Sequence, residues 1–277
     1  MSTRRIQIET ADLCNLSCLV CDAKRLPHTM HMMDLALFKE IIAYEKTKQI
    51  LPTIQFGYRS EFLADPRAVE LSRICKPLHV VLWTNGVLLR QFLENEGYAS
   101  EVVISILGGM DGDYSYTYVT GLDINDTLNL IADTAKYIQV SVCLSTYRFE
   151  QAYALIGVLQ SYNVKTIYVN QMTIPKEGYE RFTARTFPQL QLPKVVISSL
   201  SPSFPHKGCP MIDWDVCINS RGNLELCCLS NAIEIGEWSK DYETILNRYR
   251  SMSKFGMPPH PKCIEYNGCK HLFRSME

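Results

Sequence analysis

Residues 5–21, RIQIETADLCNLSCLVC, join a strand-like run to three closely spaced cysteines. Apolar and polar residues alternate at the start of this stretch, which is the period of a β-strand with one buried face. Cys14, Cys18 and Cys21 follow with the spacing C-x3-C-x2-C. Three thiolates this close in sequence can bind three irons of a 4Fe–4S cluster and leave the fourth iron open to a small molecule. The stretch therefore predicts a strand that leads into an iron–sulfur loop.

A zinc site and disulfide bonds are the alternatives for these cysteines. Structural zinc usually takes four ligands, and His28 and His31 are the nearest candidates for a fourth. Disulfides belong to oxidising compartments, and no secretory signal precedes the run, which begins shortly after Met1. We therefore expect an iron–sulfur site in a cytoplasmic protein.

Composition excludes several classes of function. The chain has 277 residues with 47% hydrophobic and 21% charged residues, eleven cysteines and a net charge of −1. This charge gives no indication of nucleic-acid binding or of a membrane surface. No apolar run approaches the ~18 residues of a membrane span. Eleven cysteines without a secretory signal favour metal binding.

Strands and helices alternate through the first 170 residues. We expect strands at 4–10, 53–56, 79–84, 101–106, 139–145 and 166–170. Helices are expected to begin at Asp34, Asp65, Leu88, Asp123 and Phe149. Six β–α alternations imply a parallel sheet, and right-handed crossovers bend it toward a barrel. Such folds place their active sites at the C-terminal ends of the strands, which is where the cysteine loop lies.

The cysteine run resembles the signature of the radical S-adenosylmethionine (SAM) enzymes. The resemblance implies an α/β fold with a partial (β/α)6 barrel, and a cluster that splits SAM into methionine and a 5′-deoxyadenosyl radical. Residues 55–66, QFGYRSEFLADP, resemble the family's "GGE" element, and 84–86 resemble its T-N-G element. In the family the glutamate holds the SAM ammonium through a charge-assisted hydrogen bond, so Glu61 is the candidate here. The resemblance implies further SAM contacts from Val20, Gly57, Tyr58, Ser60, Asn85 and Ser105.

This sequence departs from the family pattern at three points. One residue is inserted between Gly57 and Glu61, and Phe62 stands where the family has proline. Val20 replaces the usual aromatic residue before the third cysteine, and valine fills apolar space without stacking.

Cysteines crowd the last quarter of the chain. This arrangement resembles the SPASM/twitch extension of radical SAM enzymes, which carries an auxiliary 4Fe–4S cluster. The ligands that the resemblance implies are Cys209, Cys227, Cys263 and Cys269. Cys228 is the alternative to Cys227, Cys217 is expected to be a small core residue, and a four-cysteine zinc site is the alternative for the lobe. We expect two domains, a barrel at 1–200 and an auxiliary lobe at 201–277, with a hairpin around Gly222.

Strand alternation indicates which side chains face the barrel lumen. Polar residues on the expected inner face are the candidates for substrate contacts, namely Glu9, Gln55, Ser141, Tyr168 and Asn170. Gln7 shares this face and has a second possible role in supporting the cluster loop. Cys143 lies between Ser141 and Ser145 on the same face and is the candidate hydrogen-atom donor, with space filling as the alternative.

A polar lumen favours a polar small-molecule substrate. The sequence thus indicates a radical SAM enzyme acting on a sugar, cyclitol or nucleoside intermediate, fed by an electron donor such as flavodoxin or ferredoxin. A peptide-modifying maturase is the first alternative, and a non-catalytic iron–sulfur or zinc-binding protein is the second. Whether the reaction is an oxidation, an epimerisation or a sulfur insertion stays open.

Overall fold

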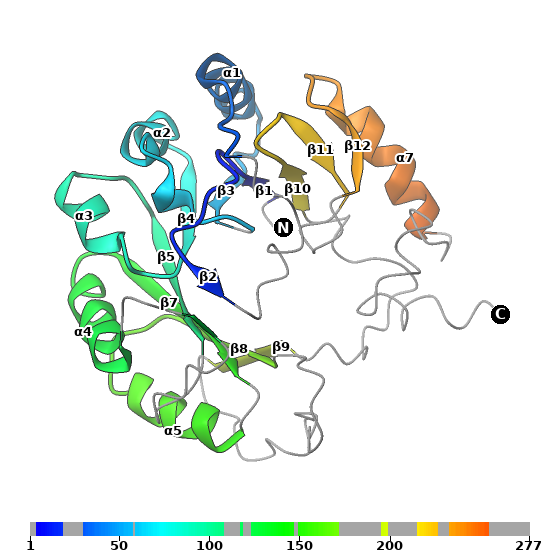
Figure 1. The fold of residues 1–277 in the computed structure, drawn as a ribbon. Coiled ribbons are helices and arrows are strands. Elements are labelled where there is room, and N and C mark those ends of the chain that lie inside the picture. The colour runs from blue at the N-terminus through cyan, green and yellow to red at the C-terminus, as the bar shows by residue number, and fades with distance from the viewer. Residues whose placement is uncertain are drawn as a thin grey trace.

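The computed structural model describes residues 4–18, 30–57, 59–107, 117–118, 123–146, 149–171, 195–198, 215–226 and 233–254. Ten of its described strands form one sheet, curved into an arc, with helices along its outer side (Figure 1). The strand order is β12-β11-β10-β1-β3-β4-β5-β7-β8-β9. The strands are β1 (Arg5–Ile8), β3 (Thr53–Phe56), β4 (His79–Thr84), β5 (Glu101–Leu107), β7 (Gln139–Thr146), β8 (Ile167–Gln171), β9 (Val195–Ser198), β10 (Asp215–Ile218), β11 (Asn223–Glu225) and β12 (Glu234–Glu237).

From β10 to β9 all neighbouring strands run parallel. Because the described sheet ends at β12 and at β9 without joining, it forms a partial barrel. This confirms the predicted α/β class and the open (β/α) barrel.

Helices follow most of the parallel strands, as the alternation predicts. They are α1 (Leu35–Lys46), α2 (Ala68–Ile74), α3 (Leu89–Glu94), α4 (Ile124–Thr134), α5 (Phe149–Leu159) and α7 (Tyr242–Lys254). Asp34 caps α1 by accepting a hydrogen bond from the Leu37 N–H at 3.0 Å, and Asp123 caps α4 through the Asp126 N–H at 2.8 Å. Such caps satisfy backbone donors that a helix start leaves without partners.

The start of α2 differs from the prediction. The sequence predicts a helix that begins with Asp65 and Pro66, whereas the structure has a short 3₁₀ turn at Phe62–Ala64 and an α-helix from Ala68. The Asp65 carboxylate accepts from the Arg67 N–H at 2.9 Å and also binds the Arg67 side chain. These contacts hold residues 65–67 in a turn, so the helix begins three residues later.

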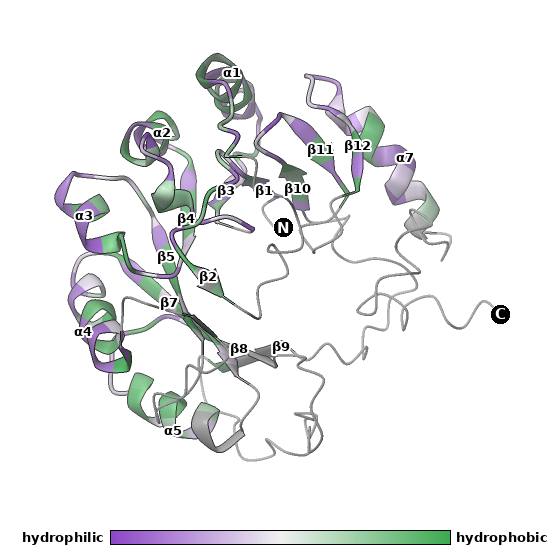
Figure 2. Cartoon of the chain, viewed as in Figure 1, coloured by the Kyte–Doolittle hydropathy of each residue, from purple (hydrophilic) through white to green (hydrophobic). Residues whose placement is uncertain are grey.

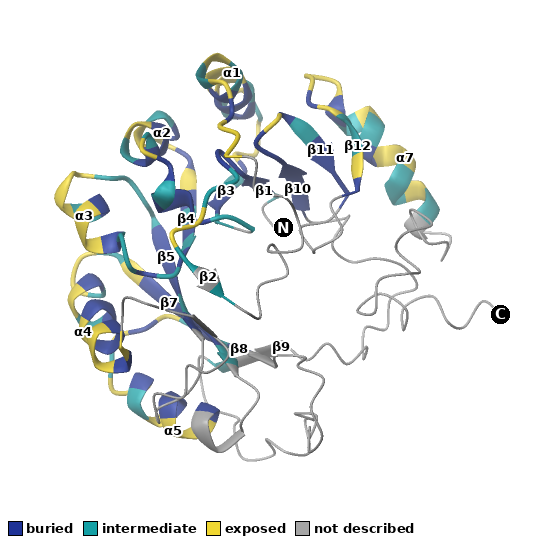
Figure 3. Cartoon of the chain, in the orientation of Figure 1, coloured by how far each residue is buried: buried dark blue, intermediate teal, exposed yellow. Residues whose placement is uncertain are grey.

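The sheet has an apolar outer face and a polar inner face. Ile6, Ile54, Val80, Val102 and Val140 point outward into one core with the helices. The helices carry both apolar and polar residues (Figure 2), and exposed residues lie mainly on their outer sides (Figure 3). The strand alternation therefore leaves the polar residues of β1, β3, β5, β7 and β10 on the concave side, as expected for a period of two.

The predicted hairpin around Gly222 extends the barrel sheet. Its first strand, β10, pairs in parallel with β1, so that Asp215 lies opposite Arg5 and Cys217 lies opposite Gln7. Sequence analysis places this hairpin in a separate lobe, and the boundary at residue 200 stays a prediction. Among the described helices, none has the length and apolar character that crossing a membrane requires.

Candidate functional site

The cysteine loop leaves the C-terminal end of β1. Cys14 is exposed and Cys18 is half-buried in the short strand β2 (Ser17–Cys18). β2 pairs with β6 (Thr117–Tyr118), with Cys18 opposite Thr117, and it lies inside the arc of the sheet (Figure 1). Cys21 and Val20 lie outside the described residues. Two of the three predicted iron ligands, Cys14 and Cys18, therefore lie in the segment that follows the C-terminal end of β1.

Gly57 ends β3 in a conformation that favours glycine. Its φ is +80°, and a Cβ there would lie 2.0 Å from the Trp83 carbonyl oxygen. Any other residue would force β3 and β4 apart at their C-terminal ends. Tyr58, predicted beside it, lies outside the described residues. The close approach of the two strands brings the segment after β3 next to the segment after β4.

Glu61 connects these two segments. Its carboxylate accepts hydrogen bonds from the Thr84 hydroxyl at 2.9 Å, the Asn85 N–H at 2.8 Å and the Leu63 N–H at 3.2 Å. Burial raises the pKa of Glu61, against the effect of these three donors. The GGE-like and T-N-G elements are thus joined through one carboxylate.

The same two elements hold the cysteine loop. The Glu61 N–H donates to the Leu13 carbonyl at 2.8 Å, and the Asn85 amide donates to the Asn15 side chain at 2.8 Å. The residues on either side of Cys14 are therefore attached to the predicted SAM-binding residues. The structure brings together the cysteine loop, Glu61 and Asn85.

Three further predicted residues lie side by side on the neighbouring strands β5, β7 and β8. Ser105 lies opposite Cys143, and Cys143 lies opposite Tyr168. Cys143 is 4% exposed, whereas Ser105 and Tyr168 are half-buried. The Tyr168 ring lies 5.9 Å from the Trp83 ring, centroid to centroid, although two strands separate them in the sheet. Asn170 lies further along β8, and its side chain is outside the described set.

A charged network lies where β1 meets the hairpin. Arg59 donates to Glu9 at 3.3 Å and to Glu225 at 2.8 Å, and all three side chains are nearly buried. Asn219 donates to Glu225 at 3.0 Å and to Glu234 at 2.8 Å. Arg59 therefore links the segment after β3 to the C-terminal hairpin.

The pKa of Glu9 is raised in this network. Burial raises its pKa, Arg59 opposes that shift, and Glu225 and Asp12 add to it. Ser60, predicted as a SAM contact, donates a side-chain hydrogen bond to Glu9.

Gln55, a predicted substrate contact, binds Gln7, which was predicted to share its face of the sheet. Gln55 donates to the Gln7 side-chain oxygen at 3.2 Å, and Gln7 donates to Asp215 at 2.8 Å. Arg5 holds Asp215 with two hydrogen bonds of 2.7 Å. The side-chain oxygen of Gln55 is buried without a hydrogen-bond partner among the described residues. The Gln55 side-chain oxygen can therefore accept a hydrogen bond from a donor that the described residues do not supply.

Ser141 belongs to a second buried polar group. Its hydroxyl donates to Glu101 at 2.7 Å, and Lys165 donates to the other Glu101 oxygen at 2.7 Å. Ser141 is fully buried, so the structure uses its hydroxyl to bind Glu101.

Sequence reasoning missed Arg59, Glu101 and Glu225. Arg59 lies inside the GGE-like element, and strand alternation puts Glu101 on the same face as Ser105, so both could have been found. Glu225 could not, because its place depends on the pairing of β10 with β1.

The donor set fits an iron–sulfur cluster. Cys14 is exposed and Cys18 is half-buried in the loop that follows β1, and cysteine thiolates are the usual ligands of such clusters. Buried Cys75, at the C-cap of α2, contrasts with them, because burial raises its pKa to about 12 and keeps it a neutral thiol. The predicted auxiliary ligands Cys209, Cys227, Cys263 and Cys269, and the alternative Cys228, lie outside the described residues. Within the described part of the chain, no three Cys, His, Asp or Glu residues converge on one metal position.

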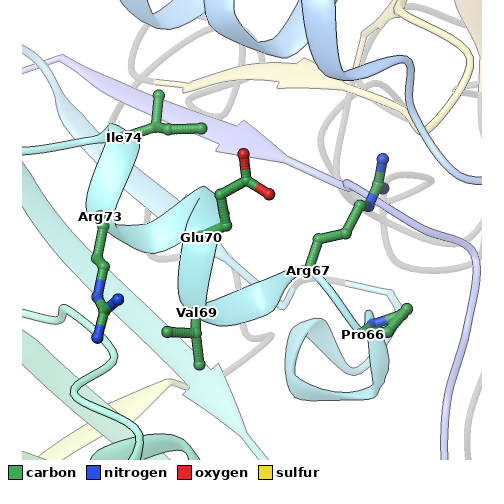
Figure 4. A pocket seen from close by; sticks show the side chains of 6 residues that line it. All are labelled: Pro66, Arg67, Val69, Glu70, Arg73 and Ile74. Atoms are coloured by element: carbon green, nitrogen blue, oxygen red, sulfur yellow. The ribbon is translucent and has the colours of Figure 1, made fainter.

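A surface hollow lies on the helix side of the sheet. It is lined by Pro66, Arg67, Val69, Glu70, Arg73 and Ile74, all in or next to α2 (Figure 4). Because these residues lie on the outer side of the barrel, this hollow is not the lumen site.

Several solved structures of other proteins share the fold of this chain. SuiB from Streptococcus suis, bound to S-adenosylmethionine, matches with a TM-score of 0.68 at 14% identity, over 97% of this chain and 72% of SuiB. The anSMEcpe structure with bound AdoMet matches with a TM-score of 0.60 at 15% identity, over 96% and 86%. BtrN in complex with AdoMet and 2-DOIA matches with a TM-score of 0.57 at 13% identity, over 98% and 92%. No family model matches the sequence, and no curated protein does.

These neighbours are radical SAM enzymes. The chain therefore shares the fold of these enzymes, and a C-x3-C-x2-C loop follows its first strand. The resemblance stated from the sequence is confirmed at the level of the fold.

Proposed function

We propose that this chain is a radical SAM enzyme that abstracts hydrogen from a polar small molecule. The observation that carries the proposal is the attachment of the cysteine loop to Glu61 and Asn85 on the next two strand ends. Cys14, Cys18 and Cys21 hold the cluster, which when bound supplies the electron that splits SAM into methionine and a 5′-deoxyadenosyl radical.

The chain's own residues bind and orient the reactants. Glu61 binds the SAM ammonium, with Gly57, Ser60, Asn85 and Ser105 around the rest of the molecule. Glu61 is nearly buried and already accepts three hydrogen bonds. A carboxylate can accept about four, so it has capacity for one donor more.

The concave face supports a substrate with several hydrogen-bonding groups. Buried Gln55 keeps a side-chain oxygen without a partner among the described residues, and Tyr168 and Trp83 add a pair of half-buried rings that lie against each other. A hydroxyl or ammonium donor satisfies the Gln55 oxygen, and an apolar substrate does not. This favours a sugar, cyclitol or nucleoside intermediate, with Glu9 and Asn170 as further contacts.

The neighbours include both small-molecule and peptide complexes. BtrN is in complex with 2-DOIA, and SuiB has been seen bound to precursor peptide SuiA. The peptide-modifying alternative is therefore retained, and the two are separated by testing which class of compound changes the rate of SAM cleavage. We further propose the auxiliary cluster at Cys209, Cys227, Cys263 and Cys269, and an electron donor such as flavodoxin or ferredoxin.

The test of the class is SAM cleavage by protein reconstituted without oxygen. With dithionite as reductant, the wild type should release 5′-deoxyadenosine, detected by mass spectrometry. The triple change of Cys14, Cys18 and Cys21 to Ala should release none. Cys75→Ala is the matched control, because Cys75 is buried in the helix layer, and it should behave as the wild type does. Absence of 5′-deoxyadenosine from cluster-loaded wild type would favour the non-catalytic alternative.

A further inference from the structure

The two ends of the cysteine loop meet next to the sheet. The Met33 N–H donates to the Thr10 carbonyl at 2.8 Å, and the Asp12 N–H donates to the His31 carbonyl at 3.0 Å. Ala11 and Met32 form an antiparallel bridge between these two contacts. The loop that contains all three cysteines therefore begins and ends at one point.

Arg67 binds both sides of that point. Its Nη1 donates to the Met33 carbonyl at 2.8 Å, and its Nη2 donates to the Thr10 carbonyl at 3.3 Å. Thr10 is the last residue before the bridge and Met33 is the first after it. One guanidinium from the turn before α2 thus connects the chain entering the loop with the chain leaving it.

Asp65 fixes the orientation of this guanidinium. Its two carboxylate oxygens accept from Arg67 Nε at 3.0 Å and from Arg67 Nη2 at 2.8 Å. The Asp65 side chain is 0% exposed. A two-point pair between a guanidinium and a buried carboxylate determines both position and angle.

We propose that Arg67, oriented by Asp65, is a positioning residue that keeps the cysteine loop closed so that its three thiolates hold the cluster. The proposal rests on the proposed function for the cluster itself, although the contacts with Thr10 and Met33 exist without it. Outer partners that orient metal ligands typically change metal affinity by roughly 10- to 100-fold when removed.

The geometry requires arginine. Four of its five side-chain N–H directions are directed at Asp65, Met33 and Thr10. Lysine keeps the charge but has a single nitrogen, which cannot bind two carbonyls and two carboxylate oxygens in these directions. Arg67→Lys therefore keeps the positive charge but removes the planar guanidinium, so it tests the hydrogen-bond geometry apart from the charge.

Arg73, in the last turn of α2, provides a matched control close to Arg67. It also donates to two backbone carbonyls, those of Asn95 at 2.8 Å and Glu96 at 3.1 Å. Figure 4 shows Arg67, just before α2, and Arg73, near the end of α2, extending in different directions. Arg73→Lys disturbs an equivalent pair of bonds without touching the cysteine loop.

The experiment compares wild type, Arg67→Lys, Arg67→Gln, Asp65→Asn and Arg73→Lys, all prepared without oxygen. Hydrogen–deuterium exchange of peptides containing Asp12 and Met33 measures loop closure. Transfer of iron to a coloured chelator measures cluster loss, and the electron paramagnetic resonance signal of the reduced cluster, with and without SAM, identifies which cluster is affected.

We expect faster exchange at Asp12 and Met33 in the three variants of Arg67 and Asp65. Their SAM-responsive cluster should be lost roughly 10- to 100-fold faster, while Arg73→Lys matches the wild type. Unchanged exchange in Arg67→Lys and Arg67→Gln would overturn the proposal, and so would faster exchange without faster cluster loss. A wild type that binds no cluster would instead overturn the proposed function, and the exchange comparison would still decide whether Arg67 closes the loop.

Discussion

Replacing Glu61 by Gln tests the proposed SAM site with little change in shape. The carboxylate accepts from the Asn85 N–H on one oxygen, and from the Thr84 hydroxyl and Leu63 N–H on the other. Glutamine turns one of these oxygens into an NH₂ group. In either orientation a backbone N–H then faces a donor instead of an acceptor.

Two separate effects follow from this change. A buried N–H that loses its partner costs about 1–3 kcal/mol of folding free energy. Loss of the charge-assisted bond to the SAM ammonium costs a further ~1.5–3 kcal/mol of binding free energy. Since ~1.4 kcal/mol is a factor of ten, the SAM dissociation constant should rise roughly 10- to 100-fold.

Calorimetric titration of SAM into the cluster-loaded protein measures the dissociation constant, and urea unfolding measures stability. Glu45→Gln is the matched control, because Glu45 is also buried but lies in α1 and binds Tyr242. It should leave SAM affinity unchanged. If Glu61→Gln lowers stability but not SAM affinity, Glu61 only joins the two strand ends and another group holds the ammonium.

Three further predictions concern other parts of the chain. The reconstituted protein should hold about eight irons in two 4Fe–4S clusters, and changing Cys14, Cys18 and Cys21 to Ala should leave about four; zinc in the C-terminal lobe would contradict the auxiliary cluster. Reaction in deuterated water should give deuterium in the product, lost in Cys143→Ala, if the thiol between Ser105 and Tyr168 donates a hydrogen atom; an oxidised product formed equally by the variant would rule this out. Burial raises the pKa of Glu45 above its ordinary 4.5, against the hydrogen bond from Tyr242 and the charge of Arg4, so the folded protein binds this proton more tightly than the unfolded chain does. Its stabilising contribution should therefore be lost as pH rises from that ordinary value through the raised one, and urea unfolding over this pH range should show a smaller fall for Glu45→Gln than for the wild type.

Local sequence signals predicted the individual elements well. β3 and β4 begin and end where the alternation of apolar and polar residues places them, and Asp34 and Asp123 cap the helices that they were expected to cap. The cysteine loop, Glu61 and Asn85 could be placed together because parallel strands end at one edge of the sheet.

Features that depend on distant pairing were not predictable. Nothing local to residues 215–218 indicates that β10 lies beside β1, and the Arg59 network with Glu225 follows only from that pairing.

The late start of α2 was missed because Asp65 binds Arg67 more fully than a simple cap would.

The pairing of β10 with β1 affects the order in which this chain can fold during synthesis. Arg5 and Asp215 are 210 residues apart in sequence and bind each other directly. Until residue 215 leaves the ribosome, one edge of the first strand lacks its partner, and unpaired edges promote aggregation. A chain that stops near residue 200 retains this open edge permanently, with Arg5 and Gln7 left without Asp215. Expression of the barrel alone should therefore give insoluble protein, and adding residues 215–254 as a separate peptide should restore solubility by completing the edge.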